Sequence, residues 1–247
     1  MSVYWDIGPY TCYLCGDEYN IVYADERIYG NISAVHATLL LCEKCGETGF
    51  SSKDRVDSYN KTFPKYPKMT YDKGWIMGCW SCGNSYGNAV KYYGAYPNGY
   101  LKKIRSLFPE MNYESTLHLF SGSLGLQKDE DIPFNGVKFD CNTEVGADVV
   151  GDAVELSEHF KDRKFKIILA DPPYQKTDAE DHYGVPLVNK KKVIHECHKI
   201  LEPGGFLVWM DERLPMYRKS EFKRVGEILI TRSTNHRVRA VFIFERQ

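Results

Sequence analysis

The sequence predicts an α/β protein: a mostly parallel sheet with helices on both faces, preceded by a small cysteine-rich domain. Three observations support this fold class. From about residue 113 onward, short apolar strands alternate with polar or helical connections, as they do in parallel sheets. Six of the eight cysteines lie within residues 1–85. The 247 residues are 43% hydrophobic and 26% charged, which is ordinary for a folded protein.

Composition also excludes some classes of protein. No apolar run approaches the roughly 20 residues that a membrane helix needs. The N-terminal residues lack the basic and then apolar stretch of a secretion signal. We therefore expect a cytoplasmic protein that has no membrane partner. The formal net charge of −1 argues against a uniformly basic coat for binding nucleic acid.

The cysteines of the N-terminal part form three CxxC pairs, each followed by glycine: Cys12/Cys15, Cys42/Cys45 and Cys79/Cys82. Without a secretion signal, thiols two residues apart favour zinc over disulfides. The first two pairs suit a zinc ribbon with four thiolate ligands. The third pair can replace one of them, complete a second site with His36, join a two-metal cluster or stay reduced. We predict a zinc-binding domain with a linker over residues 1–85, holding structural zinc.

The elements follow in chain order. Residues 1–50 have the pattern of short strands and turns, and residues 51–78 are polar and contain proline, which predicts a loop or linker. Leu101, Ile104 and Leu107 have helical spacing before Pro109. An amphipathic helix is predicted over residues 185–205. Seven apolar segments are predicted strands, and the last two of them form an antiparallel pair. The strands are residues 115–120, 136–140, 147–152, 165–170, 205–211, 225–233 and 237–246.

The sharpest motif is Asp171-Pro172-Pro173-Tyr174, directly after the fourth of these strands. Ligands of open α/β sheets bind at the carboxyl ends of the strands. The prolines remove backbone donors and stiffen the chain, which leaves carbonyl oxygens free to accept hydrogen bonds. The tyrosine ring offers a flat face for stacking. The motif therefore offers hydrogen-bond acceptors and a stacking surface at the carboxyl edge of the sheet.

Further candidates follow the neighbouring strands. Phe120, Ser121, Gly122 and Gly125 belong to a glycine turn after the first strand, where backbone can approach a ligand closely. Asp140 ends the second strand and Asp152 follows the third. Carboxylates at these positions can accept hydrogen bonds from a ribose and from an adenine amino group.

In this order, the glycine turn, the two aspartates and DPPY resemble the class I methyltransferases that use S-adenosylmethionine. DPPY is similar to the signature of the DNA adenine-N6 enzymes. The resemblance covers roughly residues 92–247 and implies a Rossmann-like methyltransferase sheet over residues 86–247. It implies that Asp171, Pro172, Pro173 and Tyr174 are catalytic. It also implies that Phe120, Ser121, Gly122, Gly125, Asp140 and Asp152 bind the cofactor.

The resemblance implies transfer of a methyl group to the exocyclic N6 of adenine in DNA, with S-adenosylmethionine as cofactor. One alternative is an RNA enzyme that methylates guanine N2 or adenine N6. Another is a non-catalytic zinc-ribbon subunit that binds nucleic acid.

Charge is distributed unevenly along the chain. Lys and Arg outnumber Asp and Glu by 10 to 4 in residues 51–110 and by 8 to 2 in residues 213–239, whereas residues 128–181 have 7 against 14. The two basic stretches are candidate lobes for nucleic-acid phosphates, or simply solvated faces. The first lobe contains Lys61, Lys65, Lys68, Lys73, Lys91, Lys102, Lys103 and Arg105. The second contains Arg218, Lys219, Lys223, Arg224, Arg232 and Arg237.

Overall fold

The computed structural model describes residues 2–11, 18–25, 50–83, 94–232 and 238–247. Near the N-terminus, β1 (Ser2–Thr11) and β2 (Glu18–Asp25) pair as an antiparallel hairpin that forms a sheet of its own.

The four cysteines of the predicted zinc ribbon cannot be placed. The predicted ligands Cys12, Cys15, Cys42 and Cys45 lie outside the described residues, and so does His36. The four-thiolate zinc site stays a prediction from the spacing of these cysteines.

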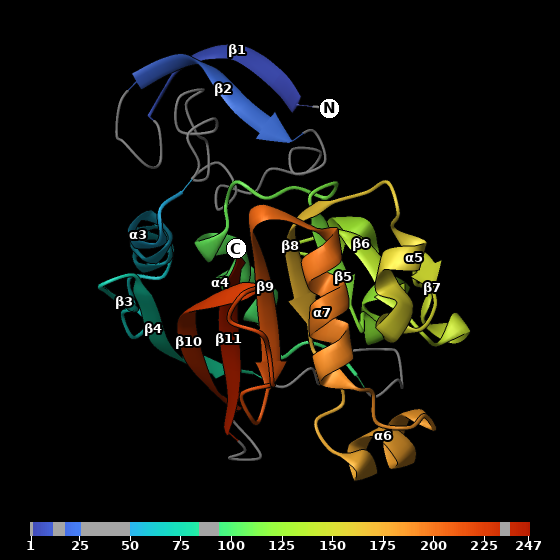
Figure 1. Cartoon of the computed structure of the whole chain (residues 1–247). Coiled ribbons are helices and arrows are strands. Elements are labelled where there is room, and N and C mark those ends of the chain that lie inside the picture. The colour runs from blue at the N-terminus through green and yellow to red at the C-terminus, as the bar shows by residue number, and fades with distance from the viewer. Residues whose placement is uncertain (1, 12–17, 26–49, 84–93, 233–237) are drawn as a thin grey trace.

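The rest of the described chain is built on one nine-stranded sheet, in the order β3-β4-β10-β11-β9-β8-β5-β6-β7 (Figure 1). Strands β5 to β9 are parallel and follow the order of a doubly wound sheet. β11 is antiparallel to both of its neighbours. The seven predicted strands and the final antiparallel pair are confirmed: β5 (Thr116–Leu119), β6 (Val137–Asp140), β7 (Val149–Val150), β8 (Phe165–Ala170), β9 (Leu201–Asp211), β10 (Phe222–Arg232) and β11 (Val238–Arg246).

Helices cover both faces of this sheet. The helices after residue 94 are α4 (Tyr100–Leu107), α5 (Leu156–His159), α6 (Lys176–Tyr183) and α7 (Lys190–Ile200). Alternate residues of β8 enter different cores. Ile167 belongs to the core that α4 contributes to, and Ile168 to the core that includes Cys197 of α7. Residues 167–170 of β8 are therefore all apolar, because both faces of this part of the strand are buried; only Lys166, near its start, is exposed.

The prediction of a loop or linker over residues 51–78 is wrong. The chain there forms α3 (Ser52–Thr62), β3 (Thr70–Asp72) and β4 (Trp75–Cys82), and β4 pairs in parallel with β10. Long-range contacts hold this segment in place. Buried Arg55 pairs with Glu110 at 2.6 Å, and the ring of Tyr59 stacks on Trp80 with centroids 5.6 Å apart. Residues 52–82 thus share a sheet and a core with the later chain, although the predicted domain boundary lies at residue 85.

The third CxxC pair belongs to β4 and not to a tight turn. Residues three apart on a strand point to opposite faces of the sheet. Accordingly, Cys79 is exposed whereas Cys82 is buried, and burial raises the pKa of the Cys82 thiol. The two thiols do not converge on one ion, which corrects the prediction that Cys79 and Cys82 bind metal as a pair. The described residues contain no cluster of three or more His, Cys, Asp or Glu side chains suited to a metal.

None of the helices in the described ranges has the length and apolar character needed to cross a membrane.

Candidate active site

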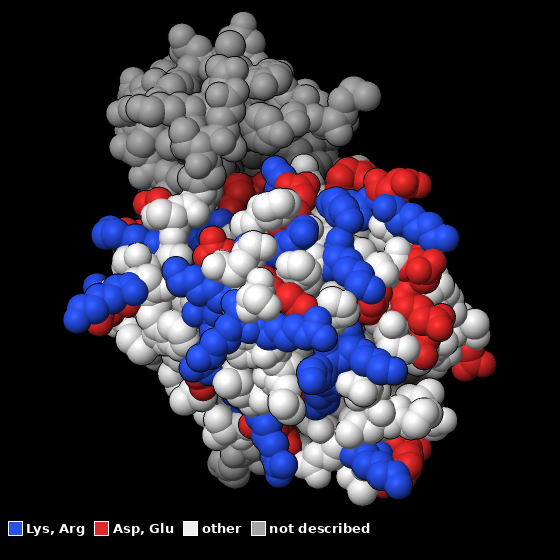
Figure 2. All heavy atoms as spheres, in the orientation of Figure 1, with Lys and Arg blue, Asp and Glu red and all other residues white. Residues whose placement is uncertain are grey.

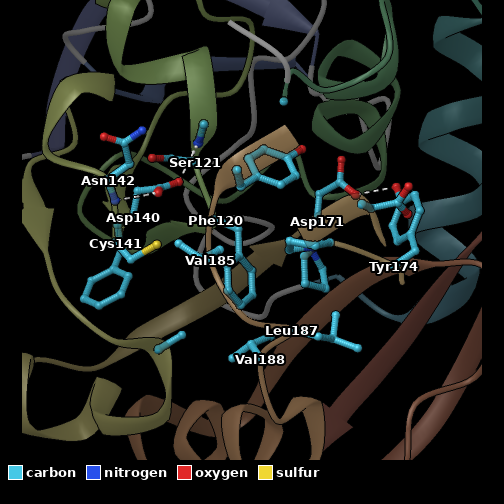
Figure 3. A pocket seen from close by; sticks show the side chains of 18 of the residues that line it. Phe120, Ser121, Asp140, Cys141, Asn142, Asp171, Tyr174, Val185, Leu187 and Val188 are labelled. Carbon is cyan, nitrogen blue, oxygen red and sulfur yellow. Dashed lines mark hydrogen bonds between the residues drawn. The ribbon is translucent and has the colours of Figure 1, made fainter. Parts of the chain in front are cut away.

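A cavity of about 1060 Å³ lies at the edge of the sheet where β5, β6 and β8 end. It is wide enough for a nucleotide-sized cofactor together with an acceptor group. Nine of the ten residues predicted for catalysis and cofactor binding line it: Phe120, Ser121, Gly122, Asp140, Asp152, Asp171, Pro172, Pro173 and Tyr174. Figure 3 shows Asp140 and Asp171 on opposite sides of Phe120, which comes from the end of β5 between them.

The glycine turn needs a glycine at residue 122. Gly122 has φ +49°, and a Cβ there would lie 2.3 Å from the carbonyl oxygen of Gly94. That oxygen accepts a hydrogen bond from the backbone N–H of Ser123 at 2.9 Å. The segment before α4 therefore packs directly on the turn, and Gly94, Ala95 and Tyr96 also line the cavity.

Gly125, the tenth predicted residue, has another role. A Cβ at Gly125 would lie 2.3 Å from the carbonyl oxygens of Val145 and Gly146. It therefore permits close backbone packing between the 3₁₀ turns Gly122–Leu126 and Thr143–Val145. Gly125 is absent from the described lining of the cavity, and its contact with the cofactor stays a prediction.

Two carboxylates organise the backbone of the same half of the cavity. Asp140 accepts hydrogen bonds from the N–H groups of Gly122 at 2.9 Å and Asn142 at 3.0 Å. Asp152 is exposed and accepts from the N–H of Val154 at 3.0 Å, which caps a 3₁₀ turn. Each aspartate thus both shapes a turn and presents its remaining acceptor capacity to the cavity.

Phe120 and Ser121 carry signs of a ligand site. Phe120 has φ +60°, a left-handed backbone conformation that costs a residue with a side chain about 1–3 kcal/mol and often marks functional positions. The hydroxyl oxygen of Ser121 is buried and has no hydrogen-bond partner in the described part of the chain. An unpaired buried hydroxyl is costly, so a polar ligand group is expected beside it.

The DPPY segment holds a half-buried acid. Asp171 follows β8, and its Oδ1 accepts a hydrogen bond from the Tyr174 hydroxyl at 2.5 Å (Figure 3). Burial raises the pKa of the Asp171 carboxyl, and the positive charge of Arg239 opposes this effect. Burial and the negative charge of Asp171 also raise the pKa of Tyr174, so its hydroxyl keeps the proton that it donates.

A partly buried ion pair that was not predicted from the sequence holds this segment in place. Lys190, the first residue of α7, lies 2.6 Å from Asp211 Oδ2 and donates to the carbonyl oxygen of Tyr174 at 3.1 Å. The indole N–H of Trp209 donates to the same Asp211 oxygen at 3.2 Å. Asp211 ends an apolar strand, just as Asp171 follows one, and this position in the sequence could have identified Asp211 as a site residue.

Tyr96 and His118 form a second pair that sequence reasoning missed. His118 lies on β5, and its Nε2 donates to the carbonyl oxygen of Phe134 at 2.8 Å. Its Nδ1 is then an acceptor, 3.3 Å from the Tyr96 hydroxyl. Burial lowers the His118 pKa to about 3, so the ring is neutral and positions the cavity-lining Tyr96. The position of His118 inside an apolar strand could have identified it from the sequence as a buried histidine with hydrogen-bond partners.

One apolar wall of the cavity comes from the chain between α6 and α7. Val185, Leu187 and Val188 line it, and Figure 3 shows Val185 next to Phe120, with Leu187 and Val188 close to each other. The polar stretch over residues 175–185, just before this wall, contains α6.

Only some of the basic side chains in the two predicted lobes are exposed and free to bind phosphates. Lys103 is buried, with its ammonium 4.6 Å from the centre of the Tyr66 ring, and Arg105 lies over Phe134. Arg224 pairs with Glu227 at 3.6 Å. Lys91 and Arg237 lie outside the described residues. Figure 2 nevertheless shows Lys and Arg side chains gathered across the face over β10, β11 and α7.

No protein-family model and no curated protein sequence matches the chain. Among solved structures, TrmN from Thermus thermophilus is similar at 17% identity and a TM-score of 0.39, over 53% of this chain and 43% of that protein. The putative methyltransferase yhhF from Escherichia coli is similar at 16% identity and a TM-score of 0.35, over 55% and 77%. An rRNA methylase from Streptococcus thermophilus is similar at 12% identity and a TM-score of 0.35, over 56% and 90%.

The described part of the chain has a mixed α/β sheet with mostly parallel strands, and this assignment rests on its strand order. The chain spans less than half the length of TrmN.

Proposed function

We propose that this protein transfers a methyl group from S-adenosylmethionine to the exocyclic N6 of adenine in DNA. The single observation that carries the proposal is the position of DPPY on the wall of one cavity that also holds the glycine turn. A half-buried carboxylate, a rigid pair of prolines and an aromatic ring there lie beside residues suited to a nucleoside cofactor.

The residues at the β5 and β6 end of the cavity fit this cofactor. The unpartnered Ser121 hydroxyl and the bare backbone of Gly122 provide a polar group and close access. Asp140 and Asp152 offer carboxylate oxygens to ribose hydroxyls and to an adenine amino group. When bound there, S-adenosylmethionine supplies a methyl group activated by a positively charged sulfur.

Asp171 and Pro172 orient the acceptor. An exocyclic amine is a poor nucleophile because its lone pair is delocalised into the ring. The Tyr174 hydroxyl occupies Oδ1 of Asp171, which leaves Oδ2 to accept one N–H of the amine. The Pro172 carbonyl accepts the other N–H. These two acceptors direct the lone pair and stabilise the positive charge that develops on nitrogen. Holding the reacting groups in line contributes roughly 7–11 kcal/mol.

Tyr174 has two roles in this proposal. Its hydroxyl holds the Asp171 carboxylate in place, as described above. Its ring provides the stacking surface for the flipped base. The guanidinium of Arg239 lies 4.8 Å from the ring centroid, so a base stacks on the ring surface that Arg239 leaves uncovered.

The test is transfer of a labelled methyl group from S-adenosylmethionine to duplex DNA, single-stranded DNA and RNA, each with and without adenine. Asp171→Asn keeps the size of the side chain and removes its charge, so transfer should fall at least ~100-fold with little change in cofactor affinity. The matched control is Asp162→Asn, at an exposed acid outside the cavity wall.

The outcomes separate the candidate functions. Label confined to adenine-containing DNA supports the proposal. Label in RNA or in adenine-free substrates moves the assignment to an RNA or guanine enzyme. Bound cofactor without any label, or equal transfer by Asp171→Asn and the wild type, contradicts the proposed role of DPPY.

A further inference from the structure

Charge changes sign along the edge of the sheet that carries the cavity. In spatial order, Asp140 ends β6, Asp171 follows β8 and Asp211 ends β9. The next two strands instead bring arginines to this edge, Arg239 on β11 and Arg232 on β10, and both line the cavity. One half of the cavity is therefore acidic, whereas the other half has two guanidinium groups.

Arg239 is a buried cation without an acidic partner at ion-pair distance among the described residues. It is 8% exposed, and its Nε is buried and has no hydrogen-bond partner there. Its guanidinium stacks on the Tyr174 ring. The Nε of Arg232 is likewise buried and unpaired in the described part of the chain. Burying a guanidinium without hydrogen bonds to an acceptor is costly, so an anion is expected between these groups.

Two other buried cations of the described chain have acidic partners. Arg55 pairs with Glu110 at 2.6 Å, and Lys138 pairs with Asp129 at 2.8 Å. Both are almost fully buried, and each has an acid within hydrogen-bond distance. Lys103 is also buried without an acid at ion-pair distance among the described residues, but it lies against the rings of Phe63 and Tyr66 outside the cavity. Arg239 differs from these cations because it lines the cavity, where a ligand can reach it.

The position of the arginines decides which ligand supplies the anion. Strands β8 and β9 separate β11 and β10 from β5 and β6, where the cofactor residues lie. Asp171 stands between these two ends, at the point where the acceptor amine binds in the proposed function. An anion on Arg239 and Arg232 therefore belongs to the acceptor. A guanidinium fork matches phosphate oxygens in geometry and charge.

We propose that Arg239 and Arg232 form a subsite for a phosphate group of the acceptor nucleotide, next to its base. This inference rests on the proposed function and narrows its substrate class to nucleotides, with free bases and nucleosides as poor acceptors. The acidic half repels the phosphate and the arginine half attracts it, so the charge pattern orients the nucleotide with its base toward Asp171.

The first experiment measures binding of 3′- and 5′-deoxynucleoside monophosphates, and of the matching nucleosides, to the full chain loaded with S-adenosylhomocysteine. All four bases are included, so the phosphate preference does not depend on the adenine assignment. We expect the wild type to bind at least one monophosphate about 10-fold or more tightly than its nucleoside. In Arg239→Gln this preference should fall below about 3-fold, with nucleoside and cofactor affinities within about 2-fold of wild type. Arg232→Gln should show a smaller loss.

The matched control is Arg163→Gln. Arg163 also lies over an aromatic ring, that of Phe165 at 4.9 Å, but it pairs with Glu114 and is not among the residues that line the cavity. This variant should keep the wild-type preference. Arg239→Lys retains the charge and provides a second variant if Arg239→Gln is poorly folded.

A second experiment uses an oligonucleotide with one methylatable base and a neutral methylphosphonate on either side of it. The neutral linkage should weaken binding to the wild type and have little further effect on Arg239→Gln. Labelled DNA with no phosphate preference in the wild type would overturn the inference and leave the proposed function standing. Phosphate preference that depends on Arg239, without label in any nucleic acid, would support the subsite and overturn the proposed function. Loss of cofactor binding in both Arg239 variants would show that the arginine is structural and overturn the inference.

Discussion

Replacing Gly122 by alanine tests whether the glycine turn shapes the cofactor end of the cavity. The new Cβ would lie 2.3 Å from the Gly94 carbonyl oxygen, well inside the 3.0 Å that real Cβ contacts respect. Either residue 122 or the chain at Gly94 must therefore move by at least about 0.7 Å, the difference between these two distances. Such a shift pulls on the hydrogen bond from Ser123 N to Gly94 O and on that from Gly122 N to Asp140.

The expected magnitude follows from these contacts. The left-handed backbone at φ +49° costs a residue with a Cβ about 1–2 kcal/mol. Weakening one or two hydrogen bonds adds about 0.5–1.5 kcal/mol for each bond. Gly122→Ala should therefore lower the free energy of unfolding by about 2–4 kcal/mol. Affinity for S-adenosylhomocysteine should fall about 10-fold or more, because the turn no longer presents its backbone at the cavity wall.

Gly204→Ala is the matched control. Gly204 also has positive φ, at +73°, but no described atom lies within 4 Å of its added Cβ. It should show only the backbone cost of about 1–2 kcal/mol and unchanged cofactor affinity. Denaturant unfolding and calorimetric titration with S-adenosylhomocysteine measure both effects. Equal stability and equal cofactor affinity for the two variants would refute the reasoning that close packing at Gly122 builds the site.

Three further perturbations test other parts of the molecule. Lys190→Met leaves the buried Asp211 carboxylate unpaired and should cost about 3 kcal/mol in denaturant unfolding; an unchanged midpoint would contradict the pairing. The pKa of Asp171 is raised by burial, and its carboxylate form accepts the amine, so methyl transfer should decline with falling pH sooner than an ordinary aspartate predicts. The same shift means that the folded state binds this proton more readily than the unfolded state, so this group favours folding more as pH falls. Elemental analysis should find at least about one zinc per chain, lost in Cys12→Ser or Cys45→Ser and kept in Cys79→Ser; loss in Cys79→Ser alone would contradict the strand geometry.

The sheet after residue 113 was predictable because its strands are local signals. Each is a short apolar run, and β8 has no polar residue at its centre because both of its faces are buried. DPPY could be placed for the same reason, since a motif directly after a buried strand must lie at the carboxyl edge of the sheet.

Residues 52–82 were not predictable because their burial depends on distant partners. Arg55 looks like a surface residue in the sequence, yet its guanidinium lies against the rings of Phe108 and Phe206, with each ring centroid 4.6 Å away. Tyr59 and Trp80 meet only when α3 packs on β4. Amphipathic side chains of this kind do not give the simple apolar period on which helix prediction depends.

Arg239 shows the same limit within the site. In the sequence it is one of eight basic residues over positions 213–239, which suggests a solvated surface. Its direction is set by the register of β11 against β9, in which Ala240 pairs with Asp211. That register brings the start of β11 to the cavity edge, and no local pattern in residues 238–246 contains this information.

The parallel pairing of β4 with β10 also protects the protein from aggregation. Without β4, the eleven-residue β10 would be the edge of the sheet and would offer a long row of unpaired backbone groups to another chain. With it, the two outermost strands of this sheet are β3, of three residues, and β7, of two. Such short edges are poor templates for strand addition. A chain truncated to the residues of the cavity alone would expose the long edge, so the segment over residues 52–82 contributes to solubility even where it touches no ligand.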